Sequence, residues 1–372
     1  MTDVQELLER YNPLLVTLPE RPLALNRPGR RGPCRPSRGD YHPISAELFL
    51  QHATLQTEDD RAGGFGRLLG APFSWSPPEG PTGAAEIRAS VESTPSPEQS
   101  RGWFLDLTAV RSQSSGQAWS AYAELLQRTE AAARREARVV YGRATEARGT
   151  RYLQYWYLYA YNDAFNNHEG DWEQATIELR DDGTPERVGF SAHHGGGWRP
   201  WSEVKKDADS KRPLLFVSRG SHAGHFAYKE RGWRPRNVRI HTGLPLLDVP
   251  VTAAARFLAL ARLTVDRPPA IEPSDVDWSP CDAGVLVDPG VRRIPDAPAP
   301  WEEDGFWWMR FQGKWGSTHP RVNGTHGPGS PWAPDAGDVR WSHPGAWLES
   351  VPRDPKTSSR SPLVDLSHAQ WG

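Results

Sequence analysis

The fold is decided by the stretch QYWYLYAYNDAFNNHEGDWEQATIEL, residues 154–179. Its first part has a tyrosine at every second position, and Trp156, a leucine and an alanine lie between the tyrosines. Apolar residues on both faces at a period of two indicate a β-strand that is covered on both sides. The second part has the same period from Asp171 onward and predicts a neighbouring strand over residues 172–179.

Two further segments of strand length follow this stretch, at residues 187–193 and 213–218. The turn-forming sequences DDGTPE and HHGGG separate the strands, and no helical pattern lies between the first three. Successive strands without intervening helices favour antiparallel pairing. We therefore expect a mainly β protein, an antiparallel β-sandwich with a few peripheral helices and long Pro/Gly-rich loops.

The helical signals are few. Apolar spacing and proline position predict helices over residues 43–53, 117–138 and 252–263. Residues 77–98 are rich in proline, glycine and serine, and we expect them to form a loop.

The sequence contains no internal repeat and no linker that divides it. We expect one domain over residues 1–372, with irregular tails at residues 1–40 and 351–372. The 35 prolines and 34 glycines exclude a helical bundle or coiled coil. Nine of the 17 tryptophans lie from Trp278 onward, and we expect them to hold the late loops against the sandwich.

Charge and hydropathy exclude several classes of partner. The net charge of −2 gives no basic footprint for nucleic acid. No apolar stretch is long enough for a transmembrane segment, and the N-terminus lacks the pattern of a signal peptide, so a cytoplasmic protein is expected. Cys34 and Cys281 favour two reduced thiols over a disulfide. The sequence does not specify an oligomeric state.

The candidate chemistry lies at the start of the second predicted strand. Period two places Asp171 and Glu173 on one face, which becomes apolar further along the strand. His168 on the preceding turn and Asp163 on the loop before it can reach the same place. Three carboxylates with one imidazole suit a divalent cation, Mg²⁺, Ca²⁺, Mn²⁺ or Zn²⁺. From spacing alone, the alternative is a hydrogen-bonded polar cluster at a strand end.

Further histidines lie downstream at predicted strand ends. His193 and His222 are the candidates for a fourth ligand or for a catalytic general acid/base near the ion. Ser191 and Ser221 each have a histidine nearby but are not part of a G-x-S-x-G motif, which disfavours serine hydrolysis. The sequence contains no P-loop, no G-x-G-x-x-G after a strand, no H-E-x-x-H and no paired C-x-x-C.

Three motifs in order, HEGDWEQATIEL, GFSAHHGGGW and LLFVSRGSHAGHF, resemble the vacuolar protein sorting-associated protein 62 family. That family has a histidine-x-Gly-Asp-Trp-Glu run, a Ser-x-His-x-Gly-Gly segment, and a strand followed by a Gly/Ser-His-Ala motif. The resemblance covers most of residues 1–350 and is densest over residues 152–226. It does not imply a particular biochemical activity.

A more distant likeness is to the necrosis- and ethylene-inducing cytolysins, whose heptapeptide is Gly-His-Arg-His-Asp-Trp-Glu. His168, Asp171, Trp172 and Glu173 match it, whereas the residues at positions 167, 169 and 170 depart from it. In that family the matching His, Asp and Glu hold a divalent cation in a β-sandwich, together with an upstream Asp that could correspond to Asp163. The ion helps those proteins to engage sugar headgroups of membrane lipids. The likeness therefore implies a metal site here, and it does not imply cytolysis.

Three functions remain open from the sequence. The first is a metal-binding β-sandwich that recognises a small polar ligand, a glycan or lipid headgroup bearing sugar or phosphate, through the ion. The second is a metal-dependent hydrolase or lyase in which His193 or His222 moves protons. The third is a structural ion site accompanied by an aromatic interaction surface.

Overall fold

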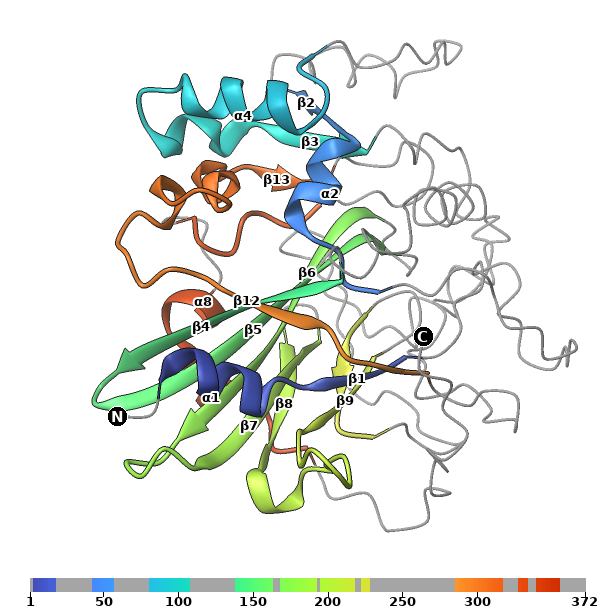
Figure 1. Ribbon diagram of the computed structural model, residues 1–372, viewed down its shortest axis with the longest axis vertical. Coiled ribbons are helices and arrows are strands. Elements are labelled where there is room, and N and C mark those ends of the chain that lie inside the picture. Colours follow the sequence, from blue (N-terminus) through green and yellow to red (C-terminus); the bar gives the residue numbers. More distant parts are fainter. Residues whose placement is uncertain are drawn as a thin grey trace, which may run out of the picture.

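The computed structural model describes residues 3–17, 42–56, 80–107, 138–162, 168–192, 195–217, 222–227, 285–316, 327–333 and 339–354. Its central element is a six-stranded sheet with the order β12-β4-β5-β6-β7-β8 (Figure 1). The strands are β4 (Val139–Ala147), β5 (Thr150–Asn162), β6 (His168–Leu179), β7 (Pro185–Ala192), β8 (Gly195–Pro200) and β12 (Gly290–Arg293). Strands β4 to β8 pair antiparallel in chain order, while β12 adds parallel to β4.

Two smaller sheets accompany the central one. A four-stranded sheet has the order β10-β9-β1-β11, and a three-stranded sheet has the order β13-β3-β2. The first is formed by β1 (Leu14–Thr17), β9 (Leu214–Val217), β10 (Gly224–His225) and β11 (Val285–Val287). The second is formed by β2 (Ala53–Gln56), β3 (Phe104–Leu107) and β13 (Lys314–Trp315). The fold is therefore mainly β and sandwich-like, as expected, with parallel pairs where segments distant in sequence join a sheet.

The strand β5 has the two covered faces that its period predicts. Tyr155 and Tyr157 pack in one apolar cluster with Leu15 of β1 and Leu215 of β9. Trp156 and its even-numbered neighbours pack in a second cluster on the opposite face, with β2, β3 and β13. This arrangement places β5 and its partner β6 at the centre of the molecule, between two hydrophobic layers.

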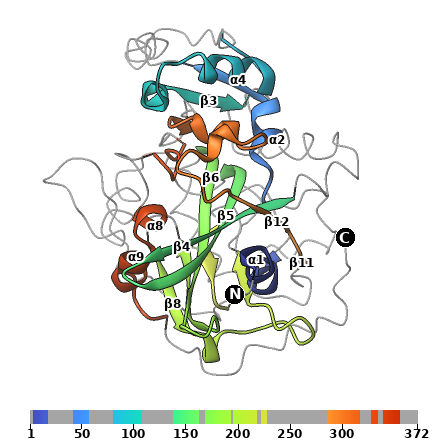
Figure 2. The same ribbon diagram turned by 60° about the vertical axis from the view of Figure 1, so that its left-hand side comes forward.

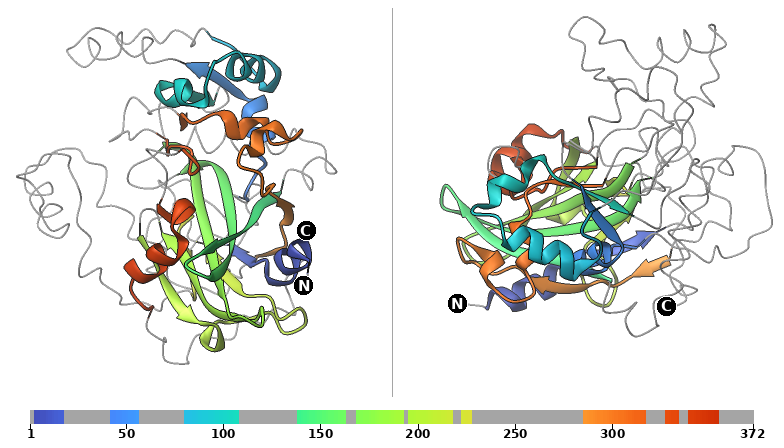
Figure 3. Two further views of the ribbon diagram at one scale, coloured as in Figure 1. Left: turned by 90° about the vertical axis from the view of Figure 1, so that its left-hand side faces the viewer. Right: turned by 90° about the horizontal axis from the view of Figure 1, so that it is seen from above.

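The helices lie around these sheets. In the described residues they are α1 (Val4–Tyr11), α2 (Ala46–Gln51), α4 (Ala84–Glu92), α8 (Val339–Ser342) and α9 (Pro344–Ser350), with short 3₁₀ turns at Pro97–Gly102, Trp201–Glu203, Pro300–Glu302 and Trp307–Arg310. Figures 2 and 3 show α8 and α9 on one side of the central strands and α1 on the other. The helix predicted over residues 43–53 is confirmed as α2. Those predicted over residues 117–138 and 252–263 lie outside the described residues, except Arg138.

Two expectations about irregular segments were wrong. Residues 77–98, expected as a loop, contain α4, whose Ile87 and Val91 are fully buried. The expected irregular tail at residues 1–40 contains α1 and β1, because Asp3 caps the helix and Leu8 is fully buried against the sheet. In both segments the burial of an apolar helix face outweighs a composition that favours coil.

The late tryptophans pack as expected where the structure describes them. Trp308 and Trp315 are fully buried, and their ring centroids are 6.0 Å apart with the planes at 87°. Trp172 of β6 lies 5.4 Å from Trp315 in an edge-to-face contact. Aromatic pairs with this geometry are favourable beyond the area that they bury. The tryptophans thus fix the C-terminal segments against the central sheet.

Candidate functional site

The third residue of β6, Gly170, is a glycine that the fold requires. Gly170 has φ +65°, and a Cβ at this position would lie 1.9 Å from the backbone oxygen of Trp315. The backbone of β13 crosses β6 at this point, and a Cβ on Gly316 would likewise lie 2.0 Å from the backbone oxygen of Glu169. Only glycine adopts this backbone conformation without a steric cost while also allowing so close an approach.

Gly170 also determines which side chains share a face. The Glu169 carboxylate accepts a hydrogen bond of 2.8 Å from the backbone N–H of Leu107 in β3. His168, in contrast, places its Nε2 3.9 Å from Oδ1 of Asp171. The left-handed residue therefore interrupts the alternation and brings His168 to the same face as Asp171. Spacing alone placed His168 on a preceding turn, whereas it is the first residue of the strand.

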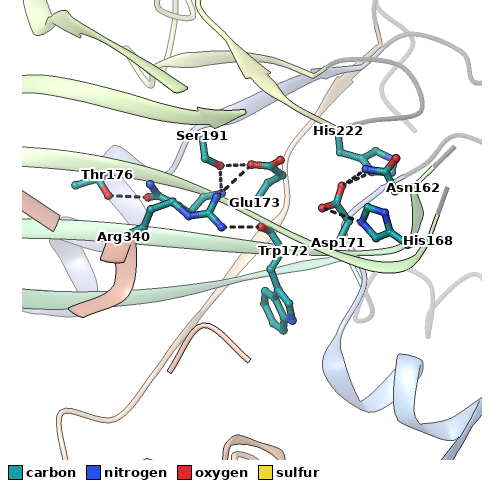
Figure 4. Close-up of polar contacts among 10 residues, drawn as sticks. Asn162, His168, Asp171, Trp172, Glu173, Thr176, Ser191, His222 and Arg340 are labelled. Carbon is teal, nitrogen blue, oxygen red and sulfur yellow. Dashed lines mark hydrogen bonds and ion pairs between the residues drawn. The ribbon is translucent and has the colours of Figure 1, made fainter. Parts of the chain in front are cut away.

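The Asp171 carboxylate is the centre of the site (Figure 4). Its Oδ2 accepts hydrogen bonds from Nδ2 of Asn162 at 3.0 Å and from Nδ1 of His222 at 3.2 Å. Its Oδ1 is directed toward His168. All four residues are buried, with exposed fractions of 0–6%. The structure thus brings together Asp171, His168 and His222 from the predicted site and adds Asn162.

The electrostatics of this group define its protonation. Burial raises the pKa of Asp171, but His168 and His222 together outweigh burial and hold that pKa well below its usual range. Burial lowers the pKa of His222 by more than Asp171 raises it. At neutral pH the site therefore contains an ionised carboxylate and a neutral imidazole. Because an ionised carboxylate only accepts, Nδ1 of His222 carries the proton in their hydrogen bond.

His222 is held in a costly backbone conformation. Its φ is +55°, in the left-handed region that is unfavourable by about 1–3 kcal/mol for a residue with a side chain. Its ring stacks on Tyr159 of β5, with centroids 4.0 Å apart and planes at 3°. The stacking and the bond to Asp171 fix both the position and the tautomer of the imidazole. Local strain maintained by surrounding contacts is common at functional sites.

Glu173 lies on the same face of β6, two residues beyond Asp171, and is also buried. Its Oε2 accepts a short hydrogen bond from Oγ of Ser191 and lies 3.6 Å from Nη1 of Arg340 in α8. Figure 4 shows the Glu173 carboxylate between this pair and His222. In the described arrangement, then, the second predicted carboxylate contacts an arginine and a serine.

Arg340 and Ser191 occupy the edge of β6 where β7 ceases to pair. Backbone pairing of the two strands begins at Ala175 and Phe190. Beyond that point the N–H of Gln174 donates to Oγ of Ser191 at 2.7 Å, and Nη2 of Arg340 lies 3.5 Å from the carbonyl oxygen of Trp172. Side chains thus replace a missing strand and satisfy buried backbone groups. No sequence motif points to Arg340, which is 167 residues from Glu173 along the chain.

Two of the predicted site residues, Asp163 and His193, lie outside the described residues. In the part of the chain that the structure describes, no helix is both long and apolar enough to cross a membrane. In the same residues, no group of three or more His, Cys, Asp or Glu side chains could hold a metal ion as it stands. The donor chemistry of Asp171 nevertheless fits a cation, because its carboxylate is ionised and a carboxylate must be deprotonated to bind a metal ion. The 3.9 Å between Oδ1 of Asp171 and Nε2 of His168 exceeds a hydrogen bond and is about 0.6 Å more than the ~3.3 Å separating two ligands of one Zn²⁺.

Comparison with known proteins finds proteins that are similar in sequence and solved structures that are similar in part. The putative vacuolar protein sorting-associated protein TDA6 of Saccharomyces cerevisiae is 29% identical over 168 residues, which are 41% of this chain and 30% of that protein. Vacuolar protein sorting-associated protein 62 of the same yeast is 28% identical over 182 residues, which are 46% of this chain and 33% of that protein. The chain thus spans about a third of the length of these relatives. No protein-family model matches it.

Among solved structures, necrosis and ethylene inducing protein 2 from the causal agent of cocoa's Witches Broom disease has a TM-score of 0.22 at 22% identity, over 25% of this chain and 46% of that one. The structure of NLPPya in complex with glucosamine has a TM-score of 0.21 at 18% identity, over 27% and 50% of the two chains. The sequence relatives agree with the three motifs. The chain is therefore similar to vacuolar protein sorting-associated protein 62 over slightly less than half of its length.

Proposed function

We propose that this protein binds a divalent cation at Asp171 and recognises a polar ligand, a sugar or phosphate headgroup, through that ion. The observation that carries the proposal is a buried, ionised carboxylate whose Oδ1 faces Nε2 of His168 at 3.9 Å. That separation is too long for a hydrogen bond between the two groups. Oδ2 of Asp171 accepts from Asn162 and His222, so we assign the ion to Oδ1, on the side of His168.

The residues divide into ligands and a positioning group. Asp171 and His168 would hold the ion, with Asp163 and Glu173 as the further ligands that the sequence predicts. His222 and Asn162 both donate to Oδ2 of Asp171, and they fix the orientation of the carboxylate. Such outer hydrogen bonds commonly affect metal affinity by about 10- to 100-fold. The imidazole in the ligand set suits Zn²⁺, whereas the carboxylates also suit Mn²⁺, Mg²⁺ and Ca²⁺.

The bound ion would supply a Lewis-acidic position for an oxygen of the headgroup. The chain's own residues hold the site in place and exclude water from its inner side, because Asp171 and His222 are only 5% and 1% exposed. Tyr159 closes that side by stacking on the imidazole. Ligand recognition through an ion of this kind does not require a catalytic group.

The variant Asp171→Asn tests the proposal, because it keeps the shape of the side chain and removes the charge. We expect elemental analysis to find about one ion per wild-type chain and almost none in the variant. Glu178→Gln is the matched control: it removes another carboxylate of β6, which pairs with Arg187 at 2.8 Å away from the site. Equal metal content in the wild type and in Asp171→Asn would refute the proposal.

Ligand recognition is tested with two probes, glucosamine for a sugar headgroup and inorganic phosphate for a phosphate headgroup. Titration calorimetry should show binding of one probe to the metal-loaded wild type and no binding to Asp171→Asn. Binding that is equal in the two proteins would contradict recognition through the ion. If neither probe binds the metal-loaded protein, the headgroup part of the proposal is wrong, while the metal part stands.

The second candidate function is a metal-dependent hydrolase or lyase with His222 as general acid/base. A specific observation favours it: His222 is neutral, buried, and hydrogen-bonded through Nδ1 to an ionised carboxylate, which is the arrangement of an oriented general base. The variant His222→Gln separates the two functions. Hydrolysis of p-nitrophenyl phosphate or acetate that is lost in this variant at full metal content supports the enzyme. The absence of any turnover by the wild type supports the binder.

A further inference from the structure

The Glu173–Arg340 ion pair connects the proposed metal site to the C-terminal helices α8 and α9. Glu173 is a carboxylate that the sequence assigns to the ion, but in the structure it contacts Ser191 and Arg340. Both side chains of the ion pair are buried, with exposed fractions of 4% and 7%. A buried carboxylate that faces a fixed cation on one side and an ion site on the other can be shared between them.

Arg340 has a defined position that does not depend on Glu173 alone. Its guanidinium lies over the ring of Trp156 at 5.6 Å, and its carbonyl oxygen accepts a hydrogen bond of 2.5 Å from Nε2 of Gln154. The next residue, Trp341, packs against the same Trp156 with ring centroids 5.5 Å apart. Arg340 is therefore the residue through which α8 contacts the buried polar edge of β6.

We propose that Arg340 competes with the divalent ion for Glu173, so that ion binding at Asp171 weakens the docking of α8 and α9 on the sheet. The proposal rests on the proposed metal site and adds its regulation. When Glu173 turns toward the ion, Arg340 loses its contact with the Glu173 carboxylate in a buried position. Separating a buried ion pair is unfavourable, and two cations near one carboxylate repel each other.

The coupling is reciprocal by thermodynamic necessity. If ion binding weakens the docking of α8 by a certain free energy, the docking of α8 weakens ion binding by the same free energy. Removing the positive charge of Arg340 should therefore strengthen ion binding, whereas removing a structural residue of the site would weaken it. This opposite sign distinguishes a competitor from a group that merely supports the fold.

The test is the dissociation constant for Mn²⁺, measured by titration calorimetry on the full chain. In Arg340→Gln we expect tighter binding by about tenfold, and in Arg340→Lys, which keeps the charge, a value close to that of the wild type. Arg353→Gln is the matched control, because Arg353 belongs to the same C-terminal segment and pairs at 2.6 Å with Glu203, away from the site. Arg340→Gln combined with Glu173→Gln should show no gain over Glu173→Gln alone.

A second measurement uses the unaltered protein and does not depend on the folding of a variant. Hydrogen exchange should become faster in α8 and α9 when Mn²⁺ is added, and remain unchanged in α1. Unchanged or slower exchange in α8 and α9, or an affinity in Arg340→Gln no higher than in the wild type, overturns the competition while leaving the metal site intact. A wild-type chain that binds no Mn²⁺, Zn²⁺, Mg²⁺ or Ca²⁺ overturns both proposals.

Discussion

Gly170 offers the most direct test of how the site is built. An alanine at this position would have to adopt φ +65°, which costs about 1–2 kcal/mol for a residue with a Cβ. Its Cβ would also lie 1.9 Å from the oxygen and 2.7 Å from the carbon of the Trp315 carbonyl group. Since the obstacle is backbone, β13 has to move, and forced overpacking costs about a further 1–3 kcal/mol. The expected loss of unfolding free energy for Gly170→Ala is therefore about 2–5 kcal/mol.

Gly183→Ala is the matched control for the first of these costs. Gly183 has φ +81° in the turn between β6 and β7, and no heavy atom lies within 4 Å of the position that an alanine Cβ would take there. The two variants share the conformational cost, and only Gly170→Ala has the steric one. Urea unfolding at neutral pH, followed by tryptophan fluorescence, should show a midpoint that is lower for Gly170→Ala at an unchanged slope.

The test depends on the difference between the losses of unfolding free energy in Gly170→Ala and Gly183→Ala. It should be about 1–3 kcal/mol, and it reports the crossing of β6 and β13 alone. Equal losses in Gly170→Ala and Gly183→Ala would refute the argument that this crossing fixes the start of β6. The orientation of His168 toward Asp171 would then need another explanation.

Two further predictions concern the packing and the pH dependence of stability. Trp308→Ala should lower the unfolding free energy by about 3–5 kcal/mol, because the ring is fully buried, and Trp308→Phe should lower it by less; a loss below about 1 kcal/mol in urea unfolding would contradict this. Burial raises the pKa of Asp207, but N–H and O–H donors of Ser210 outweigh it, so the folded-state pKa lies below the usual value. That stabilisation is present above the unfolded pKa and is lost as pH falls through the folded one. Asp207→Asn should therefore lower the urea midpoint at pH 7, and its difference from the wild type should shrink as the pH falls below the unfolded pKa; an equal difference at neutral and at acidic pH would contradict the assignment.

The central strands could be predicted because their local pattern matches their environment. The alternation around Trp156 is produced by two hydrophobic layers, one on each face of β5. Ile87 and Val91 of α4 also have a helical spacing, but the surrounding prolines and glycines concealed it. The spacing of apolar residues therefore indicates both β5 and α4. The prediction of a loop in place of α4 was wrong because it gave composition more weight than spacing.

The site could be predicted in part for the same reason. Asp171 and Glu173 share a face because the period of a strand requires it. The presence of His168 on that face depends on Gly170, whose left-handed conformation reflects a backbone crossing with β13 that no local pattern encodes. Arg340 could not be predicted, because its contact with Glu173 is a tertiary contact between distant segments.

The crossing of β6 by β13 also has a consequence for the order in which the chain is synthesised. Trp315 follows Gly170 by about 145 residues, and at a typical translation rate this distance corresponds to roughly 7–30 s. During that interval the nascent sheet lacks the segment that covers the start of β6. The face with Glu169 and Trp172, on which Trp315 packs in the finished protein, is then exposed to solvent and to chaperones.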